Sequence, residues 1–245
     1  MGMAINVNTL RTYGACTKWT EKWEEEFGSK YVPLATPEDW KQIGLAGFWP
    51  VLSWLYDQDG KPEYRPNLNE MHIGRQDMDC ADLDHATMVG AYLEGANLAR
   101  ASFKHADLTR INLKGAYLAQ TVFQKATLKD ADLSSAKLFM ANMMGANMAG
   151  INLAYAELYR AHLLYAKMTN ARMYYSRLVE ANLSGVNLAG TYLARATLTN
   201  ATLTDASLID ANLTIARLIG ASMIRANLTN ANLTGANLTG AILPQ

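Results

Sequence analysis

Residues 226–240 read ANLTN-ANLTG-ANLTG, and this five-residue pattern runs through most of the chain. From Met78 to Leu243, every fifth residue is Leu, Met or Phe without a break in the frame. A second series lies two residues before the first, from Gln76 to Ala241, and it is Ala at 27 of its 34 positions. The repeating unit is therefore Ala-(Asn/Asp/Thr)-Leu-x-x.

A strict period of five indicates a solenoid. A straight α-helix does not fit, because each step of five advances about 140° around the axis and would spread the Leu series over all faces. A flat strand does not fit, since side chains alternate faces with a period of two and five is odd. A unit that points inward, outward and inward, and then turns over two residues, puts every Ala and every Leu inside. A chain that bends in this way at each unit winds into coils whose backbones pair with one another.

The triplets ANL at 96–98, ADL at 131–133 and ANL at 231–233 resemble the pentapeptide-repeat family, and the resemblance covers about two thirds of the chain. It implies an all-β solenoid, a right-handed quadrilateral parallel β-helix with four pentapeptides per coil. Residues 71–245 would then form about 8.5 coils. With roughly 4.8 Å between paired strands, the rod would be on the order of 40 Å long.

Four units per coil place residues that are 20 apart in sequence one above another. Phe103 is therefore expected to stack on Phe123 in the core. Larger or polar residues at the inward Ala position, such as Ile111, Ile151 and Thr191, are interpreted as volume compensation within the core.

The N-terminal segment, residues 1–70, differs in composition, because all five Trp residues lie in it. Trp19, Trp23 and Phe27 have the spacing that puts them on one face of a helix. A second helix is expected after Thr36, a suitable N-cap that is followed by Pro. We expect this segment to be a small, mainly α-helical and aromatic-rich cap over the open end of the solenoid, or else a separate recognition module.

At the other end the repeats continue almost to Gln245, without a matching cap. The last coil is therefore expected to expose apolar core, which predicts a homodimer formed end to end. The residues expected in this contact are Leu228, Leu233, Leu238 and Leu243.

The composition favours a cytoplasmic location. No apolar run is long enough to span a membrane, and the chain does not open with a positive region followed by an apolar one, as a secretory signal would. Cys16 and Cys80 are far apart and are interpreted as reduced thiols. By its resemblance to the family, a bacterial source is expected.

Motifs for catalysis are absent from the sequence, which has no G-x-S-x-G, no phosphate-binding Gly loop and no spaced Cys/His cluster. We therefore expect no enzyme activity, no catalytic residue and no cofactor. His85 and His105 lie one coil apart and suggest a metal site, but Lys125 follows in the same column and no third ligand is in register. A structural pair is favoured, and a ligand- or metal-binding module at these histidines or in the N-terminal segment is kept as an alternative.

Nucleic acid is not an expected partner. In the fluoroquinolone-resistance branch of the family, a strongly negative rod is thought to imitate DNA towards DNA gyrase. Residues 76–245 hold 14 Lys plus Arg and 12 Asp plus Glu, and no loop interrupts their frame. This balance provides neither the negative potential needed for DNA mimicry nor a basic stripe for DNA binding. Inhibition or protection of gyrase is kept as an alternative function.

Large outward side chains concentrate in one region. Tyr117, Lys137, Glu157 and Arg177 form one column, predicted to be a ladder with the carboxylate between two cations. Aromatic and Arg enrichment on a solvent-exposed face is typical of interface centres, whereas tyrosines can also serve only to strengthen β stacking. We therefore predict a rigid scaffold for protein–protein interaction. The predicted partner surface consists of Phe139, Met140, Tyr155, Glu157, Tyr159, Arg160, Tyr174, Tyr175, Arg177 and Val179.

Overall fold

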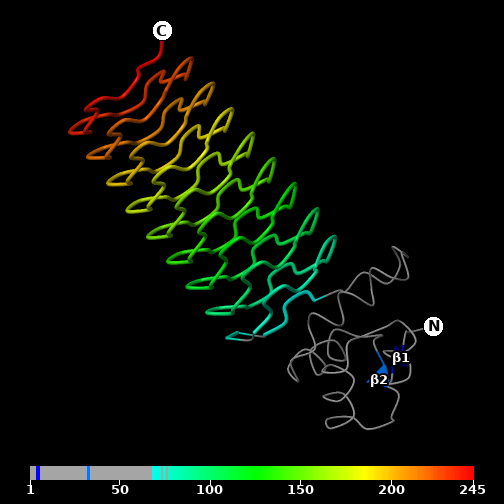
Figure 1. The fold of residues 1–245 in the computed structure, drawn as a ribbon. Helices are drawn as coiled ribbons and strands as arrows, with labels where there is room; N and C mark the ends of the chain where they lie inside the picture. The colour runs from blue at the N-terminus through cyan, green and yellow to red at the C-terminus, as the bar shows by residue number, and fades with distance from the viewer. Residues whose placement is uncertain (1–3, 6–31, 34–67, 73, 76) are drawn as a thin grey trace.

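The computed structural model describes residues 4–5, 32–33, 68–72, 74–75 and 77–245. Two short strands, β1 (Ala4–Ile5) and β2 (Val32–Pro33), pair antiparallel. Downstream of them the chain forms a rod of stacked coils that runs from Leu68 to the C-terminus (Figure 1). The two expected N-terminal helices lie outside the described residues, and none of the described residues is helical. The role of the N-terminal segment as a cap or module stays a prediction.

Each coil contains 20 residues, because parallel bridges join residues that are 20 apart, from His72 with Tyr92 to Ser222 with Ile242. Four pentapeptides therefore make one coil with four sides, as the sequence predicted. The regular pattern is already present at Leu68, which is fully buried and whose amide donates to the carbonyl oxygen of Thr87 at 2.7 Å. The solenoid thus begins earlier than the unbroken sequence frame indicated.

The fifth residue of every unit makes the turn at each corner of the coil. The amide of Ala101, for example, donates to the carbonyl oxygen of Leu98 at 3.1 Å, and the intervening Arg100 has a φ of 58°. Positive φ at the third residue of a turn is the signature of type II geometry. Glycine adopts it freely, whereas for other residues the left-handed conformation costs about 1–2 kcal/mol.

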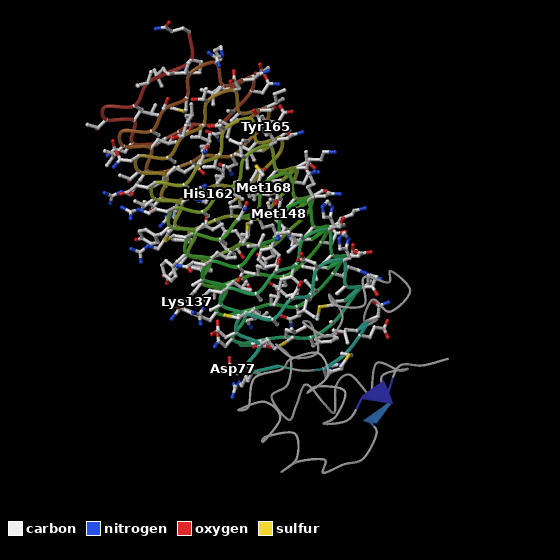
Figure 2. The ribbon with its side chains drawn as sticks, turned by 45° about the vertical axis from the view of Figure 1, so that its right-hand side comes forward. Asp77, Lys137, Met148, His162, Tyr165 and Met168 are labelled. Atoms are coloured by element: carbon white, nitrogen blue, oxygen red, sulfur yellow. The ribbon has the colours of Figure 1, made fainter. Side chains whose placement is uncertain are left out.

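The inward first and third residues of the units form one continuous buried core. Phe103 and Phe123 stack as predicted, with ring centroids 5.3 Å apart and planes 3° from parallel. Met148 and Met168, which are also one coil apart, lie inside the rod (Figure 2) and are fully buried. Residue spacing alone therefore determined which core side chains meet.

In the part of the rod that the structure describes, three inward Ala positions carry a residue with a buried hydroxyl, and each hydroxyl has a partner. The Oγ1 atoms of Thr121 and Thr191 donate to the carbonyl oxygens of Leu98 and Met168, at 2.7 and 3.0 Å. Ser176 Oγ donates to the carbonyl oxygen of Met173 at 2.6 Å. These residues are compatible with the core because a buried polar group with a hydrogen bond is not penalised as an unpaired one would be.

The outward second residue often completes the hydrogen bonding of its own unit. In the described coils between the two ends of the rod, backbone carbonyls accept from the amides of the first, second, third and fifth residues of a unit, but not from that of the fourth. An Asn or Asp side chain at the second position accepts this remaining hydrogen bond, as Asn142 Oδ1 does from the amide of Met144 at 3.1 Å. The consensus Asn/Asp is thus a structural residue, a local cap of the type known as an Asx turn.

The core opens at the C-terminal end of the rod. Leu228, Leu233 and Leu238 are half-buried, whereas Ile242 and Leu243 are 52% and 50% exposed. The predicted exposure of apolar core is confirmed. The predicted dimer stays a prediction.

Candidate protein-interaction surface

The predicted partner residues lie together on one side of the rod and at its two flanking corners. Lys137, Glu157 and Arg177 occupy the second positions of three successive coils and are linked by parallel bridges. Tyr155, Tyr174 and Tyr175 precede column residues in the sequence and lie at one corner. The turn residues at 139–140, 159–160 and 179–180 follow the column residues and lie at the other corner. We call this region the aromatic face. It consists of Lys137, Phe139, Met140, Tyr155, Glu157, Tyr159, Arg160, Tyr174, Tyr175, Arg177, Val179, Glu180 and Arg195.

The first corner of the aromatic face carries a column of stacked rings. Tyr155 and Tyr175 are parallel to within 8°, with centroids 5.1 Å apart. Tyr174 meets both rings edge-on, at 5.6 and 6.4 Å. The Arg195 guanidinium carbon lies 5.6 Å from the centre of the Tyr175 ring and extends the column by one coil. The rings stack because the fifth residues of successive coils repeat the same backbone conformation.

The second corner carries a shorter column and a shallow hollow. Phe139 and Tyr159 stack with centroids 5.8 Å apart and planes 26° from parallel. Beside them is a hollow of about 360 Å³, lined by Phe139, Met140, Tyr159, Arg160, Val179 and Glu180. Arg160 Nε donates to Glu180 Oε2 at 2.6 Å, so these two charges neutralise each other at the edge of the hollow.

The predicted ionic ladder is wrong, although its residues are in register. Among the described residues, no ion pair within 4.0 Å includes Glu157, Lys137 or Arg177. The Arg177 guanidinium carbon lies instead 5.1 Å from the centre of the Tyr159 ring. Exposed ion pairs are weak because water screens them, and contact with a ring face is of similar strength at the surface. A long side chain can therefore prefer the ring to the carboxylate.

Three members of the aromatic face lie outside the predicted partner surface: Lys137, which was assigned only to the ladder, and Arg195 and Glu180, which were not predicted. Arg195 follows Tyr155 and Tyr175 in the same column, and Glu180 follows Arg160. The interval of 20 residues was the signal that would have found both, because it is the interval at which coils stack.

The histidine pair has the predicted arrangement but no metal-site geometry. His85 and His105 stack with centroids 5.0 Å apart and planes 5° from parallel. The neighbouring carboxylate of Asp84 accepts hydrogen bonds from Ser102 Oγ at 2.5 Å and from the amide of Lys104 at 2.7 Å. In the part of the chain that the structure describes, no three His, Cys, Asp or Glu side chains come together as metal ligands.

A second hollow, of about 390 Å³, lies beside Tyr117, in the same column as Lys137 and Arg177. It is polar, and its lining includes Asp79 and Arg100. Arg100 Nε donates to Asp79 Oδ1 at 3.1 Å. Slight desolvation of the exposed Cys80 thiol, reinforced by the adjacent Asp79 carboxylate, raises the pKa of this thiol. A raised pKa reduces the thiolate fraction at neutral pH, so Cys80 does not have the environment of a nucleophile.

These features define a class of protein, the four-sided parallel β-solenoid with 20-residue coils. Within this class the chain belongs to the pentapeptide-repeat family. The family model "Pentapeptide repeats (8 copies)" matches residues 77–115, 105–138, 141–174, 176–214 and 206–245.

Solved structures of this family are similar to the chain. A trypsin-treated variant of QnrB1, a plasmid-mediated fluoroquinolone resistance protein, is 17% identical, with a TM-score of 0.56 over 71% of this chain and 89% of its own. HetL, a pentapeptide repeat protein involved in heterocyst differentiation regulation from the cyanobacterium Nostoc sp. strain PCC 7120, is 28% identical over 77% of this chain and 94% of its own, with a TM-score of 0.35. The likeness to QnrB1 supports the fold alone. No match was found among curated protein sequences.

In the described part of the chain, no helix has the length and apolarity needed to cross a membrane.

Proposed function

We propose that this chain is a non-enzymatic, rigid scaffold for protein–protein interaction and that the aromatic face is its partner surface. The proposal includes the right-handed coil, the bacterial source and the cytoplasmic location expected from the sequence. The observation that supports it is the exposure of stacked aromatic columns, with Tyr155 54% and Tyr175 43% exposed.

The physical basis of the proposal is a preformed surface that carries suitable side chains. Backbone hydrogen bonds join every coil of the rod to the next, so the aromatic face loses little conformational entropy when a partner binds. Tyr and Arg are among the residues that contribute most binding energy at protein interfaces. Arg177 and Arg195 already lie over Tyr159 and Tyr175, which limits the side-chain freedom that binding would remove.

The test replaces both Tyr159 and Tyr175 with Ser. We expect the double variant to keep its β-sheet circular dichroism spectrum and to lose proteins that the wild-type chain captures from a lysate of the native host. The matched control is the double variant Tyr92→Ser and Tyr165→Ser, since these tyrosines are 45% and 67% exposed and lie outside the aromatic face. Identical capture by wild type and the Tyr159/Tyr175 variant, together with lower stability of that variant, would show that these rings serve only to stack the coils.

The alternative function, inhibition or protection of DNA gyrase, is motivated by the fold shared with QnrB1. The near balance of 14 cationic and 12 acidic residues over 76–245 argues against it, because DNA mimicry requires a strongly negative surface. A supercoiling assay separates the two functions. The scaffold proposal expects no change in gyrase activity when the purified chain is added.

A further inference from the structure

We propose that the aromatic face binds an acidic polypeptide segment. In this arrangement the carboxylates of the segment contact Arg177 and Arg195, and one of its apolar side chains enters the hollow beside Phe139 and Tyr159. The inference rests on the proposed function, because it specifies the chemistry of the partner at the same surface.

Arg177 and Arg195 are available to bind carboxylates. Among the described residues, the cations with a carboxylate within 4.0 Å are Arg100, Lys104, Arg160 and Arg225. Arg177 and Arg195 have no such partner, and each lies over a tyrosine ring instead. A guanidinium on a ring face keeps its in-plane N–H groups available for a carboxylate, which it can bind with two parallel hydrogen bonds.

Arg177 and Arg195 lie on neighbouring coils of the rod. Arg177 pairs with Thr197, and Arg195 lies two residues before Thr197 on the same coil. The two residues therefore belong to neighbouring coils, with the Arg195 guanidinium over Tyr175 at the first corner of the aromatic face and the Arg177 guanidinium over Tyr159 at the second. A single extended segment that crosses the aromatic face from one corner to the other can reach both of them.

The aromatic face has an excess of positive charge. The chain as a whole has no formal net charge, because its 22 Lys and Arg residues balance its 22 Asp and Glu residues. The aromatic face carries four cations and two carboxylates, and one of these carboxylates, Glu180, is already paired with Arg160. The excess is positive, and complementary charge both selects a partner and accelerates its association.

The stacked columns of the aromatic face suit an acidic polypeptide better than a nucleic acid. Single-stranded nucleic acids bind by stacking their bases on free aromatic faces. Here one face of Tyr155 is against Tyr175, and Arg195 lies over the Tyr175 ring. Tyr159 is likewise placed between Phe139 and Arg177. Such stacked columns mainly offer ring edges and hydroxyl groups, which suit peptide and carboxylate oxygens.

The hollow of about 360 Å³ supplies the remaining contact. Its walls include Phe139, Met140, Tyr159 and Val179, so a side chain that enters it leaves water for an apolar environment. The partner is therefore a segment of mixed character, with acidic residues next to an apolar residue.

The experiment measures fluorescence anisotropy with the full-length chain and three labelled probes at low salt. The probes are a short peptide that repeats Glu-Glu-Leu, its charge-reversed counterpart that repeats Lys-Lys-Leu, and an oligothymidine of similar length. We expect the acidic peptide to bind most tightly and the double variant R177Q/R195Q to weaken its binding at least about tenfold. The matched control is R217Q, because Arg217 stands in the same column as Arg177 two coils further on. It should change binding by less than about twofold.

The inference is overturned if the acidic peptide does not bind, if oligothymidine binds more tightly, or if R217Q has the same effect as R177Q/R195Q. Capture of host proteins distinguishes this failure from that of the proposed function. If the Tyr159/Tyr175 variant loses its partners and R177Q/R195Q retains them, the aromatic face is the partner surface but the segment is not acidic. If both variants retain every partner, the proposed function also fails.

Discussion

Ile215 shows most clearly how the coil constrains a single residue. It occupies the fifth position of its unit with a φ of 58°, and it is the only β-branched residue among the described residues with positive φ. A branched Cβ makes the left-handed conformation less favourable still, and the side chain is 53% exposed, so packing compensates little. Replacement by Asn, which tolerates this conformation, should raise the free energy of unfolding by about 0.5–1 kcal/mol. Urea denaturation of wild type and variant measures the change.

The control for this prediction is Ile215→Val, which keeps the branched Cβ and should leave the free energy of unfolding almost unchanged. A loss of stability in the Asn variant, or an equal gain in the Val variant, would mean that the backbone conformation does not limit stability at this position.

For Arg177, the sequence predicted the position of the residue in the rod but not the partner of its side chain. Its column was predictable, because stacking at 20 residues is a property of the backbone. Its contact with Tyr159 in place of Glu157 was not. Several partners lie within reach of a long exposed side chain, and they differ in energy by less than sequence spacing can resolve.

At the scale of the pentapeptide, the second residue connects sequence to stability. In Asn142→Ala, the Met144 amide loses its acceptor, which is Asn142 Oδ1 at 3.1 Å. We expect the free energy of unfolding to fall by about 0.5–1.5 kcal/mol, the usual net value of one hydrogen bond. Lys167→Ala is the matched control, because Lys167 is a second-position residue that forms no such bond and its truncation should change stability by less than about 0.5 kcal/mol. Equal losses in both variants, measured by urea denaturation, would contradict the capping role.

The pentapeptide also explains which parts of the fold were predictable. The inward residues and the stack of Phe103 on Phe123 follow from the period alone, since the core repeats with the backbone. The capping by Asn and Asp was not predicted, because the period shows only that these side chains point outward and not that they turn back to a backbone amide. Many of them, such as Asn182 with the amide of Ser184 at 3.1 Å, instead satisfy the backbone. Information about function is therefore concentrated in outward positions that depart from Asn, Asp and Thr, as on the aromatic face.

At the scale of the whole molecule, the regular rod has an end that differs from its sides. Along the rod each coil covers the apolar interior of the next, whereas in the last coil Ile242 and Leu243 are about half exposed, at 52% and 50%. We propose that two copies of the chain meet through this coil and form an end-to-end dimer. Burial of these side chains and of the half-buried Leu228, Leu233 and Leu238 supplies the hydrophobic driving force.

Light scattering tests the dimer at micromolar concentration, where two chains of 26.9 kDa each should contribute to the measured mass. The double variant Ile242→Glu and Leu243→Glu should have the mass of one chain and keep its circular dichroism spectrum, because it places charge in the contact without entering the buried coils. Tyr165→Glu adds a charge at the side of the rod, where the residue is 67% exposed, and should remain dimeric. A wild-type mass of one chain would contradict the proposal. Monomeric behaviour of both variants would mean that the contact is not confined to the last coil.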